Sequence, residues 1–129
     1  MRRNAVTVRL ELAENLPAVV GDRVQLEQVL MNLMLNAIEA IRDGNGDLTV
    51  TSESTDDGHL LISVSDTGVG IPTDTVDRIF DTFFTTKPQG TGMGLAISRS
   101  IVESHGGRLW ATSNSGHGST FRFTLPPKV

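Results

Sequence analysis

Two asparagines stand four residues apart within a helical pattern, at Asn32 and Asn36. On a helix this spacing points both amides to one place. Asparagine is a mediocre helix former because its side chain competes for backbone hydrogen bonds. Amide oxygens suit a hard cation such as Mg²⁺, so the pair is a candidate metal site. A solvated polar helix edge is the alternative that this pair alone leaves open.

A second candidate is the carboxylate of Asp66, which follows the apolar run 60–64 and opens the stretch DTGVG. A carboxylate at the end of a strand can accept a hydrogen bond from an exocyclic amine such as that of adenine. Gly68 and Gly70 would let the backbone approach a flat ring closely. A turn closed by a bond from the Asp66 side chain is the alternative. The Asp-Thr-Gly of aspartic proteases is disfavoured, because that mechanism needs a second aspartate from a symmetric half or a dimer partner.

The third candidate is the glycine-rich stretch 90–95, GTGMGL, which leads into a helical pattern. It has neither the Walker A spacing nor GxGxxG. Free N–H groups and the helix dipole at a helix start bind phosphate, and the glycines would let the backbone wrap a phosphate chain. Lys87 lies close by in the sequence and could pair with a terminal phosphate. A flexible hinge and an ordinary solvated lysine are the alternatives.

The bulk properties limit the other classes of function. With 129 residues the chain has the length of one domain, and its net charge of −4 disfavours a general nucleic-acid binder. The absence of cysteine excludes disulfides and thiolate metal sites and is compatible with the cytosol. No apolar run is long enough to span a bilayer, and the first residues lack the apolar core of a signal peptide.

The elements that must position these residues follow from periodicity. A long helix should begin after an Asp22 cap, run to about Asp43 and end at Gly44. A second helix should cover 93–104, a short one 72–80, and a mobile loop 81–92. Strands are predicted at 5–12, 47–54, 59–65, 108–113 and 119–125, with hairpin turns at 55–58 and 114–118. This order predicts helices packed on one face of a mixed sheet, an α/β sandwich.

For two of these elements the sequence also predicts which side faces the core. Strand 5–12 should be half-buried, since its apolar residues alternate with polar ones. The long helix should turn a broad apolar face to the core, formed by Leu26, Val29, Leu30, Leu33, Ala37, Ile38 and Ile41. A polar stripe lies beside that face, formed by Gln25, Gln28, Asn32, Asn36, Glu39 and Asp43.

Taken together and in this order, the stretches resemble the ATP-binding catalytic domain of sensor histidine kinases. That domain belongs to the GHKL superfamily, with gyrase-type and chaperone ATPases. Each stretch alone is weak, but the ordered set is specific and covers nearly the whole chain. The matching segments are 28–40 for the N box, 66–70 for the G1 box, 79–87 for the F box, 90–95 for the G2 box and 116–121 for the final glycine box.

The resemblance implies a single Bergerat-type domain over 1–129, a two-layer sandwich of a mixed, mostly antiparallel sheet packed on helices. It implies that Asn36 is the main Mg²⁺ ligand with Asn32 nearby, and that Asp66 holds the adenine amine with a water shared by Ser119 or Thr120. A lid over 72–92 would be anchored by Phe80, Phe83 and Phe84. The residues assigned to catalysis are Asn32, Asn36 and Lys87. The residues assigned to ATP binding are Asn36, Asp66, Gly68, Gly70, Ile71, Phe80, Lys87, Gly90, Thr91, Gly92, Met93, Gly94, Leu95, Ser119 and Thr120.

One departure within the superfamily predicts the outcome of catalysis. The ATPase branches carry a glutamate, the general base for water, where this chain has Asn32, which cannot take a proton. The chain should therefore present the γ-phosphoryl group to an acceptor instead of hydrolysing ATP efficiently. Its three histidines look structural, so the acceptor histidine is expected on a dimerising helical hairpin of a longer parent kinase.

The expected partners follow from the same resemblance. They are ATP, the parent's own phosphoacceptor domain and a response regulator receiver domain. The fragment is expected to be monomeric, its parent homodimeric, and the domain cytoplasmic with a parent that is either soluble or membrane-attached. A GHKL-type serine kinase of the anti-sigma-factor kind and a nucleotide-binding module without catalysis are the alternative functions.

Overall fold

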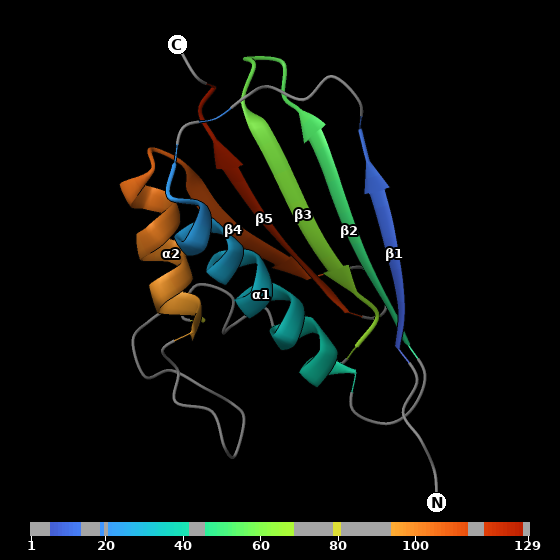
Figure 1. The fold of residues 1–129 in the computed structure, drawn as a ribbon. Coiled ribbons are helices and arrows are strands. Elements are labelled where there is room, and N and C mark those ends of the chain that lie inside the picture. The colour runs from blue at the N-terminus through green and yellow to red at the C-terminus, as the bar shows by residue number, and fades with distance from the viewer. Residues whose placement is uncertain are drawn as a thin grey trace, which may run out of the picture.

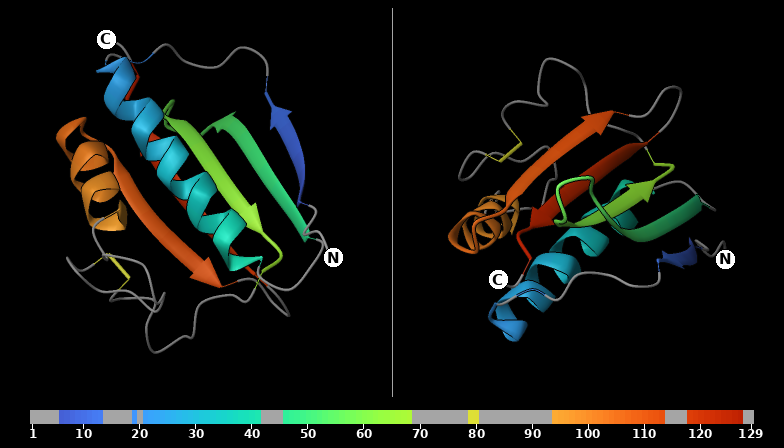
Figure 2. Two further views of the ribbon diagram at one scale, coloured as in Figure 1. Left: turned by 60° about the horizontal axis from the view of Figure 1, so that its bottom comes forward. Right: turned by 90° about the horizontal axis from the view of Figure 1, so that it is seen from above.

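One sheet and two helices account for the regular structure in the computed structural model, which describes residues 6–13, 19, 21–41, 46–68, 79–80, 94–113 and 118–127. The helices are α1 (Arg23–Ala40) and α2 (Gly94–Ser104). The strands are β1 (Val6–Leu12), β2 (Gly46–Ser54), β3 (Leu60–Asp66), β4 (Arg108–Ser113) and β5 (Ser119–Leu125). Both helices cover the same face of the sheet, which makes two layers (Figures 1 and 2).

The sheet is mixed and mostly antiparallel. Its strand order is β1-β2-β3-β5-β4, and only the β1–β2 pair is parallel among these neighbours. A parallel pair needs a crossover, and α1 supplies it between β1 and β2. The antiparallel pairs β2–β3 and β4–β5 are the two hairpins that the turn residues predicted. The predicted α/β sandwich is therefore confirmed.

Most element bounds agree with the sequence, and the end of α1 does not. The predicted helix runs to about Asp43, but α1 ends at Ala40, and Ile41 is its C-cap with φ −89° and ψ 76°. The Ile41 side chain is still buried, although its backbone has left the helical conformation. The predicted cap at Gly44 lies outside the described residues. β2 begins and β3 ends one residue beyond the prediction, which places Asp66 in β3 itself.

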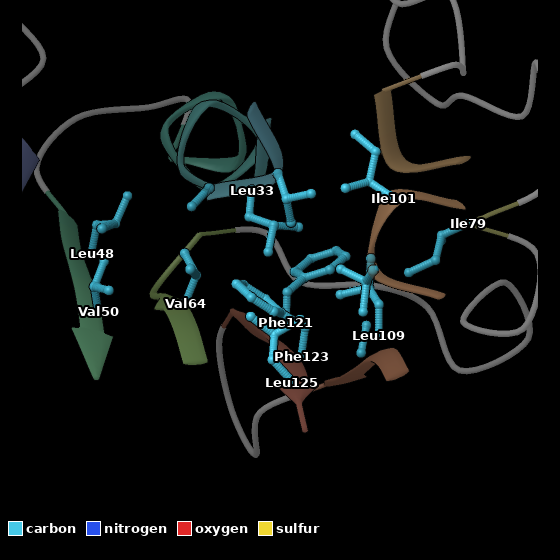
Figure 3. Packing of buried hydrophobic residues seen from close by; sticks show 14 residues of the cluster. Leu33, Leu48, Val50, Val64, Ile79, Ile101, Leu109, Phe121, Phe123 and Leu125 are labelled. Atoms are coloured by element: carbon cyan, nitrogen blue, oxygen red, sulfur yellow. The ribbon is translucent and has the colours of Figure 1, made fainter. Parts of the chain in front are cut away.

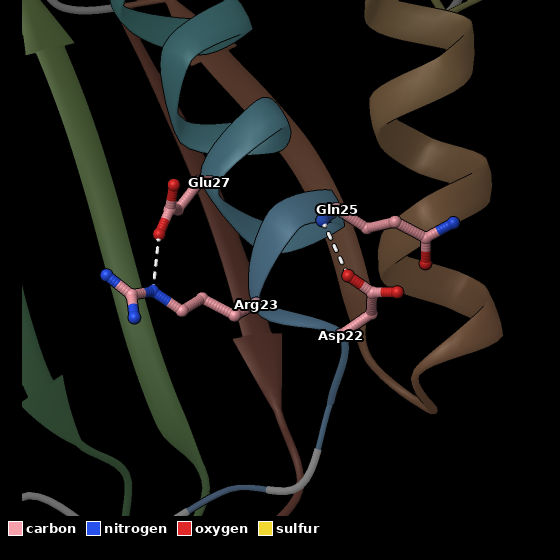
Figure 4. A network of polar contacts seen from close by, with 4 residues as sticks. All are labelled: Asp22, Arg23, Gln25 and Glu27. Carbon is pink, nitrogen blue, oxygen red and sulfur yellow. Dashed lines mark hydrogen bonds and ion pairs between the residues drawn. The ribbon is translucent and has the colours of Figure 1, made fainter.

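The start of α1 follows the predicted capping pattern (Figure 4). The Asp22 carboxylate accepts a hydrogen bond from the backbone N–H of Gln25 at 3.1 Å, which satisfies one of the donors that a helix start leaves unpaired. The next residue, Arg23, forms an exposed ion pair with Glu27 at 2.7 Å. Exposed pairs of this spacing contribute little, so the cap is the stronger determinant of where α1 begins.

The core lies between the sheet and the two helices. Leu33 of α1 and Ile101 of α2 point toward Val64 and Phe121 on the sheet (Figure 3). Phe121 is among the largest fully buried side chains of the described residues. This layer fixes both helices against β3 and β5, the strands that carry Asp66, Ser119 and Thr120 at their ends.

The predicted burial of β1 is wrong, and on the predicted apolar face of α1 it is wrong for Ile38 alone. β1 forms as expected, but Val8, Leu10 and Leu12 are 49%, 62% and 60% exposed. They lie opposite Leu48, Val50 and Ser52 of β2, so they face the same side as the core. The helices lie over the other end of the sheet and leave β1 uncovered (Figure 1). Ile38 of α1, expected in the core, is 40% exposed because it lies on the outer side of the helix with Met31 and Leu35.

Candidate functional site

A buried carboxylate stands at the end of β3. Asp66 is only 1% exposed, and both of its carboxylate oxygens are hydrogen-bonded. Oδ1 accepts from the backbone N–H of Gly68 at 2.8 Å, and Oδ2 accepts from the hydroxyl of Ser119 at 3.0 Å. The first bond is the side-chain turn that the sequence left open as an alternative. The second joins β3 to β5 and holds the carboxylate in one orientation.

Burial raises the pKa of Asp66 above its ordinary value of 3.8, because an ionised carboxylate loses its hydration there. The backbone hydrogen bond from Gly68 and the bonds from Ser119 act in the opposite direction, since they stabilise the ionised form. Burial is the larger effect. A desolvated carboxylate with fixed orientation is suited to accept a hydrogen bond from a ligand amine.

Two glycines near Asp66 lie so close to neighbouring backbone that neither position has room for a side chain. A Cβ atom on Gly118 would lie 1.8 Å from the carbonyl oxygen of Asp66, and the φ of Gly118 is +88°. A Cβ atom on Gly68 would lie 2.4 Å from the carbonyl oxygen of Ala40, the last residue of α1. Only glycine permits these approaches. They bring the end of β3, the end of α1 and the start of β5 to one place.

Ser119 and Thr120 were predicted as alternatives for a water-mediated contact with Asp66. The structure separates them. The Ser119 hydroxyl donates directly to Asp66, whereas Thr120 Oγ1 donates to Ser65 Oγ at 3.0 Å. Thr120 therefore couples β5 to β3 one position away from the carboxylate, where Ser65 is its strand partner.

The two amides of α1 lie on the side of the helix that faces α2. Asn32 Nδ2 donates to Ser98 Oγ at 3.1 Å and lies 3.4 Å from the carbonyl oxygen of Gly94. Asn36 is half-buried one turn further along α1. Amide oxygens at this spacing are chemically suited to a hard divalent cation. No cluster of three or more His, Cys, Asp or Glu side chains occurs among the described residues.

The first turn of α2 begins at Gly94, next to Asn32. Its first N–H groups have no partner within the helix, because helix geometry leaves them unpaired. Leu95 is partly buried and packs against the core, so it anchors this end of α2. The arrangement places helix-terminal donors beside the amides of α1, which is a geometry suited to phosphate.

The described part of the predicted F box is anchored in the core. Ile79 is buried, and the Phe80 ring packs edge-on against Phe121 with 6.1 Å between ring centroids. The guanidinium of Arg99 lies over the Phe80 ring, 5.5 Å from its centroid. Residues 79–80 form a turn, and the predicted short helix 72–80 lies otherwise outside the described residues.

Several predicted site residues also lie outside the described part of the chain, and their roles stay predictions. They are Gly70, Ile71, Lys87, Gly90, Thr91, Gly92 and Met93. Sequence reasoning missed Ser98, the fully buried partner of Asn32. Its signal was a polar residue on the apolar side of the helical pattern, at helical spacing from Leu95, Ile101 and Val102. Neither described helix is long and apolar enough to cross a membrane.

Comparison with known proteins gives the family. Residues 21–129 match the model of the histidine kinase-, DNA gyrase B- and HSP90-like ATPases. The chain is 49% identical over 126 residues to the sensor protein FixL of Bradyrhizobium diazoefficiens, which covers 97% of this chain. Because the match spans 25% of FixL, this chain corresponds to a quarter of that protein.

Solved structures agree in fold and sequence. The catalytic domain of the histidine kinase ThkA has a TM-score of 0.82 and 40% identity, over 95% of this chain and 79% of that one. ThkA in complex with the response regulator TrrA gives a TM-score of 0.79 and 36% identity, over 95% of this chain and 34% of that one. Full-length ShkA in complex with AMPPNP gives 0.84 and 31%, over 96% of this chain and 26% of that one.

The buried carboxylate, the paired amides and the start of α2 thus occur in a sheet-and-helix sandwich shared with histidine kinase catalytic domains. The family match covers more than half of the chain, and the relatives are sensor kinases. This chain belongs to the family of histidine kinase-, DNA gyrase B- and HSP90-like ATPases, as an ATP-binding domain of the sensor histidine kinase kind.

Proposed function

We propose that this domain binds Mg-ATP and donates the γ-phosphoryl group to a histidine on a separate phosphoacceptor domain of a two-component sensor kinase. In that step a P–N bond to the imidazole forms, the bond from the γ-phosphorus to the β–γ bridging oxygen breaks, and ADP leaves. The observation that carries the proposal is the buried carboxylate of Asp66 beside the end of α1, with a hydrogen bond to each of its two oxygens.

In this proposal each described residue has a physical task. Asp66 accepts a hydrogen bond from the adenine amine, and Ser119 keeps that carboxylate oriented. Asn36 is the principal Mg²⁺ ligand, with Asn32 beside it on the same helix. The ion would supply charge neutralisation at the phosphates. The N–H groups at the start of α2 bind phosphate oxygens. Lys87 and the glycines of 90–94 complete the phosphate contacts.

Transfer is favoured over hydrolysis because Asn32 occupies the position of a general base and cannot accept a proton. Its amide nitrogen is also engaged by α2, through Ser98 and Gly94. The domain therefore contributes position and charge stabilisation instead of activating water. Autophosphorylation of the isolated domain is not expected. His105, for example, accepts from the backbone N–H of Asp22 through Nε2 at 3.0 Å.

The partners of the proposal are those of a two-component system. The acceptor is a histidine on the parent's dimerising helical hairpin, and the phosphoryl group then passes to a response regulator. The relation to ThkA, which forms a complex with the response regulator TrrA, supports this choice. A cytoplasmic location of the domain is part of the same proposal, since receiver domains and ATP are found there.

Calorimetric titration with a non-hydrolysable ATP analogue, with and without Mg²⁺, tests the nucleotide site. We expect one-to-one binding that strengthens with Mg²⁺. Asn36→Ala should remove the Mg²⁺-dependent part, and Asp66→Asn should weaken binding in both conditions. Gln28→Ala changes an exposed amide of α1 and is the matched control. Normal binding by both site variants would refute the residue assignment.

Incubation with ATP and a phosphoacceptor histidine hairpin from a sensor histidine kinase tests the transfer. Acid-labile phosphohistidine on the hairpin, absent without the domain, is the expected product. Phosphoserine on a protein partner would support the serine-kinase alternative. Analogue binding at full affinity with no phosphoryl transfer to either acceptor would leave a nucleotide-binding module and overturn the kinase proposal.

A further inference from the structure

Ser98 is a fully buried hydroxyl in the middle of α2. Its exposure is 0%, and its neighbours on that side of the helix are the buried Ile101 and Val102. A buried hydroxyl costs free energy unless it is hydrogen-bonded. Here it accepts a hydrogen bond from Asn32 Nδ2 of α1 at 3.1 Å. A fully buried polar side chain of α2 is thus hydrogen-bonded to Asn32.

The same amide nitrogen lies 3.4 Å from the carbonyl oxygen of Gly94, the first residue of α2. Asn32 therefore contacts α2 at its first residue and one turn later, at Ser98. An amide is planar, so engaging its nitrogen with these two acceptors fixes the direction of its Oδ1. The contact joins the helix of the paired amides to the helix whose first N–H groups have no partner within that helix.

We infer that Ser98 is a positioning residue, which holds Asn32 so that the metal-binding amides of α1 and the phosphate-binding start of α2 keep one spacing. The inference rests on the proposed function for its ligand and on the Asn32–Ser98 contact for its geometry. Ser98 itself touches neither nucleotide nor metal in this account. It acts through Asn32, and α1 and α2 are joined separately at their other ends by His105 and the N–H of Asp22.

Ser98→Ala is the appropriate perturbation because it removes the hydroxyl and leaves the methylene that fills the space between the helices. Ser104→Ala is the matched control. Ser104 is on the same helix, and its hydroxyl donates to the carbonyl oxygen of Ile101 at 2.7 Å, within α2 itself. A general effect of serine removal on α2 would appear in both variants. An effect that passes through Asn32 would appear only in the first.

The first readout needs no ligand. Amide hydrogen exchange of the nucleotide-free protein should quicken in the second turn of α2, residues 98–101, in Ser98→Ala, because these N–H groups are the first that are bonded within the helix. The expected change is about fivefold, the factor that one net hydrogen bond is worth. Ser104→Ala should leave that turn unchanged. Equal exchange in wild type and Ser98→Ala would overturn the inference, because Asn32 would then hold α2 without the hydroxyl.

The second readout is the ratio of ATP-analogue affinities with and without Mg²⁺. Ser98→Ala should lower this ratio about fivefold and leave the Mg²⁺-free affinity within twofold of wild type. In an Asn32→Ala background the same serine change should add nothing. A further full loss in the double variant would contradict action through Asn32. Failure of the wild-type domain to bind the analogue would refute the proposed function, while the exchange experiment would still test the Asn32–Ser98 contact.

Discussion

Gly118→Ala should separate the cost of backbone conformation from the cost of crowding Asp66. Gly118 has φ +88°, and an added Cβ would lie 1.8 Å from the Asp66 carbonyl oxygen. Gly58, in the turn between β2 and β3, has nearly the same φ of +84°, but an added Cβ there has nothing within 4 Å. The two alanine variants therefore share the left-handed strain and differ in the contact.

The magnitudes follow from these two terms. A left-handed conformation costs a non-glycine residue about 1–2 kcal/mol, and this cost lowers the free energy of unfolding of both variants. Crowding a packed region costs about 1–3 kcal/mol more, which only Gly118→Ala loses. We expect the free energy of unfolding to fall by about 1–2 kcal/mol in Gly58→Ala and by about 2–5 kcal/mol in Gly118→Ala. Relief of the contact must move the backbone of Asp66, so analogue affinity should fall only in Gly118→Ala.

Urea unfolding monitored by far-ultraviolet circular dichroism, with the fluorescence of Trp110 as a second probe, measures both values. Trp110 is the only tryptophan of the chain and lies in β4, opposite Arg122 of β5. Coincident transitions by the two probes would justify a two-state free energy. Equal losses in the two variants, or normal analogue binding by Gly118→Ala, would refute the claim that the Asp66 backbone is held by this close approach.

Three further changes test other parts of the structure. Ser119→Ala should lower the free energy of unfolding by about 1–3 kcal/mol at neutral pH, because the buried ionised carboxylate of Asp66 loses a hydrogen-bond donor. Unfolding scans should show that this loss vanishes below pH 3.8, where Asp66 is protonated in both the folded and the unfolded state. Asp22→Ala should cost about 1 kcal/mol through the lost cap on Gln25, and an unchanged midpoint would contradict the cap. Leu10→Thr should change the free energy of unfolding by less than about 0.5 kcal/mol and reduce any concentration-dependent association in sedimentation, since Leu10 is 62% exposed.

The strands were the most predictable part of the fold. β4 and β5 begin and end where the alternation of apolar residues placed them, since a half-buried hairpin imposes that period directly. The end of α1 was less predictable, because the apolar period continues to Ile41, which is buried although it is no longer helical. Periodicity reports which side chains seek the core and does not report which backbone brings them there.

The exposure of β1 shows a second limit of periodicity. The alternation of Val8, Leu10 and Leu12 correctly gives a strand with one apolar side. Whether that side is covered depends on where α1 crosses the sheet, and α1 packs mainly against β3 and leaves β1 uncovered (Figure 2). Burial is set by the placement of a separate element, which a local pattern does not contain.

The candidate site divides in the same way. The residue types at Asp66, Asn32 and Asn36 could be singled out from the sequence because each is unusual for its position. Their partners could not be, since Ser119 lies 53 residues from Asp66 and Ser98 lies 66 residues from Asn32. Both partners are serines, a common residue type whose presence in a sequence does not indicate a special role. Only the fold shows that each one fixes the orientation of a side chain that could bind ligand.

The buried carboxylate of Asp66 lowers the stability of the fold, and ligand recognition is a reason to retain it. Its pKa is raised by burial, so protonation favours the folded state, and this contribution is lost as the pH rises through the folded pKa. At neutral pH the ionised carboxylate therefore reduces stability, and the bonds from Gly68 and Ser119 offset only part of the lost hydration. A ligand amine would supply a further donor to the same carboxylate. Burial of this carboxylate thus lowers the stability of the fold and favours a ligand that offers a hydrogen-bond donor at that position, which is a compromise between stability and recognition.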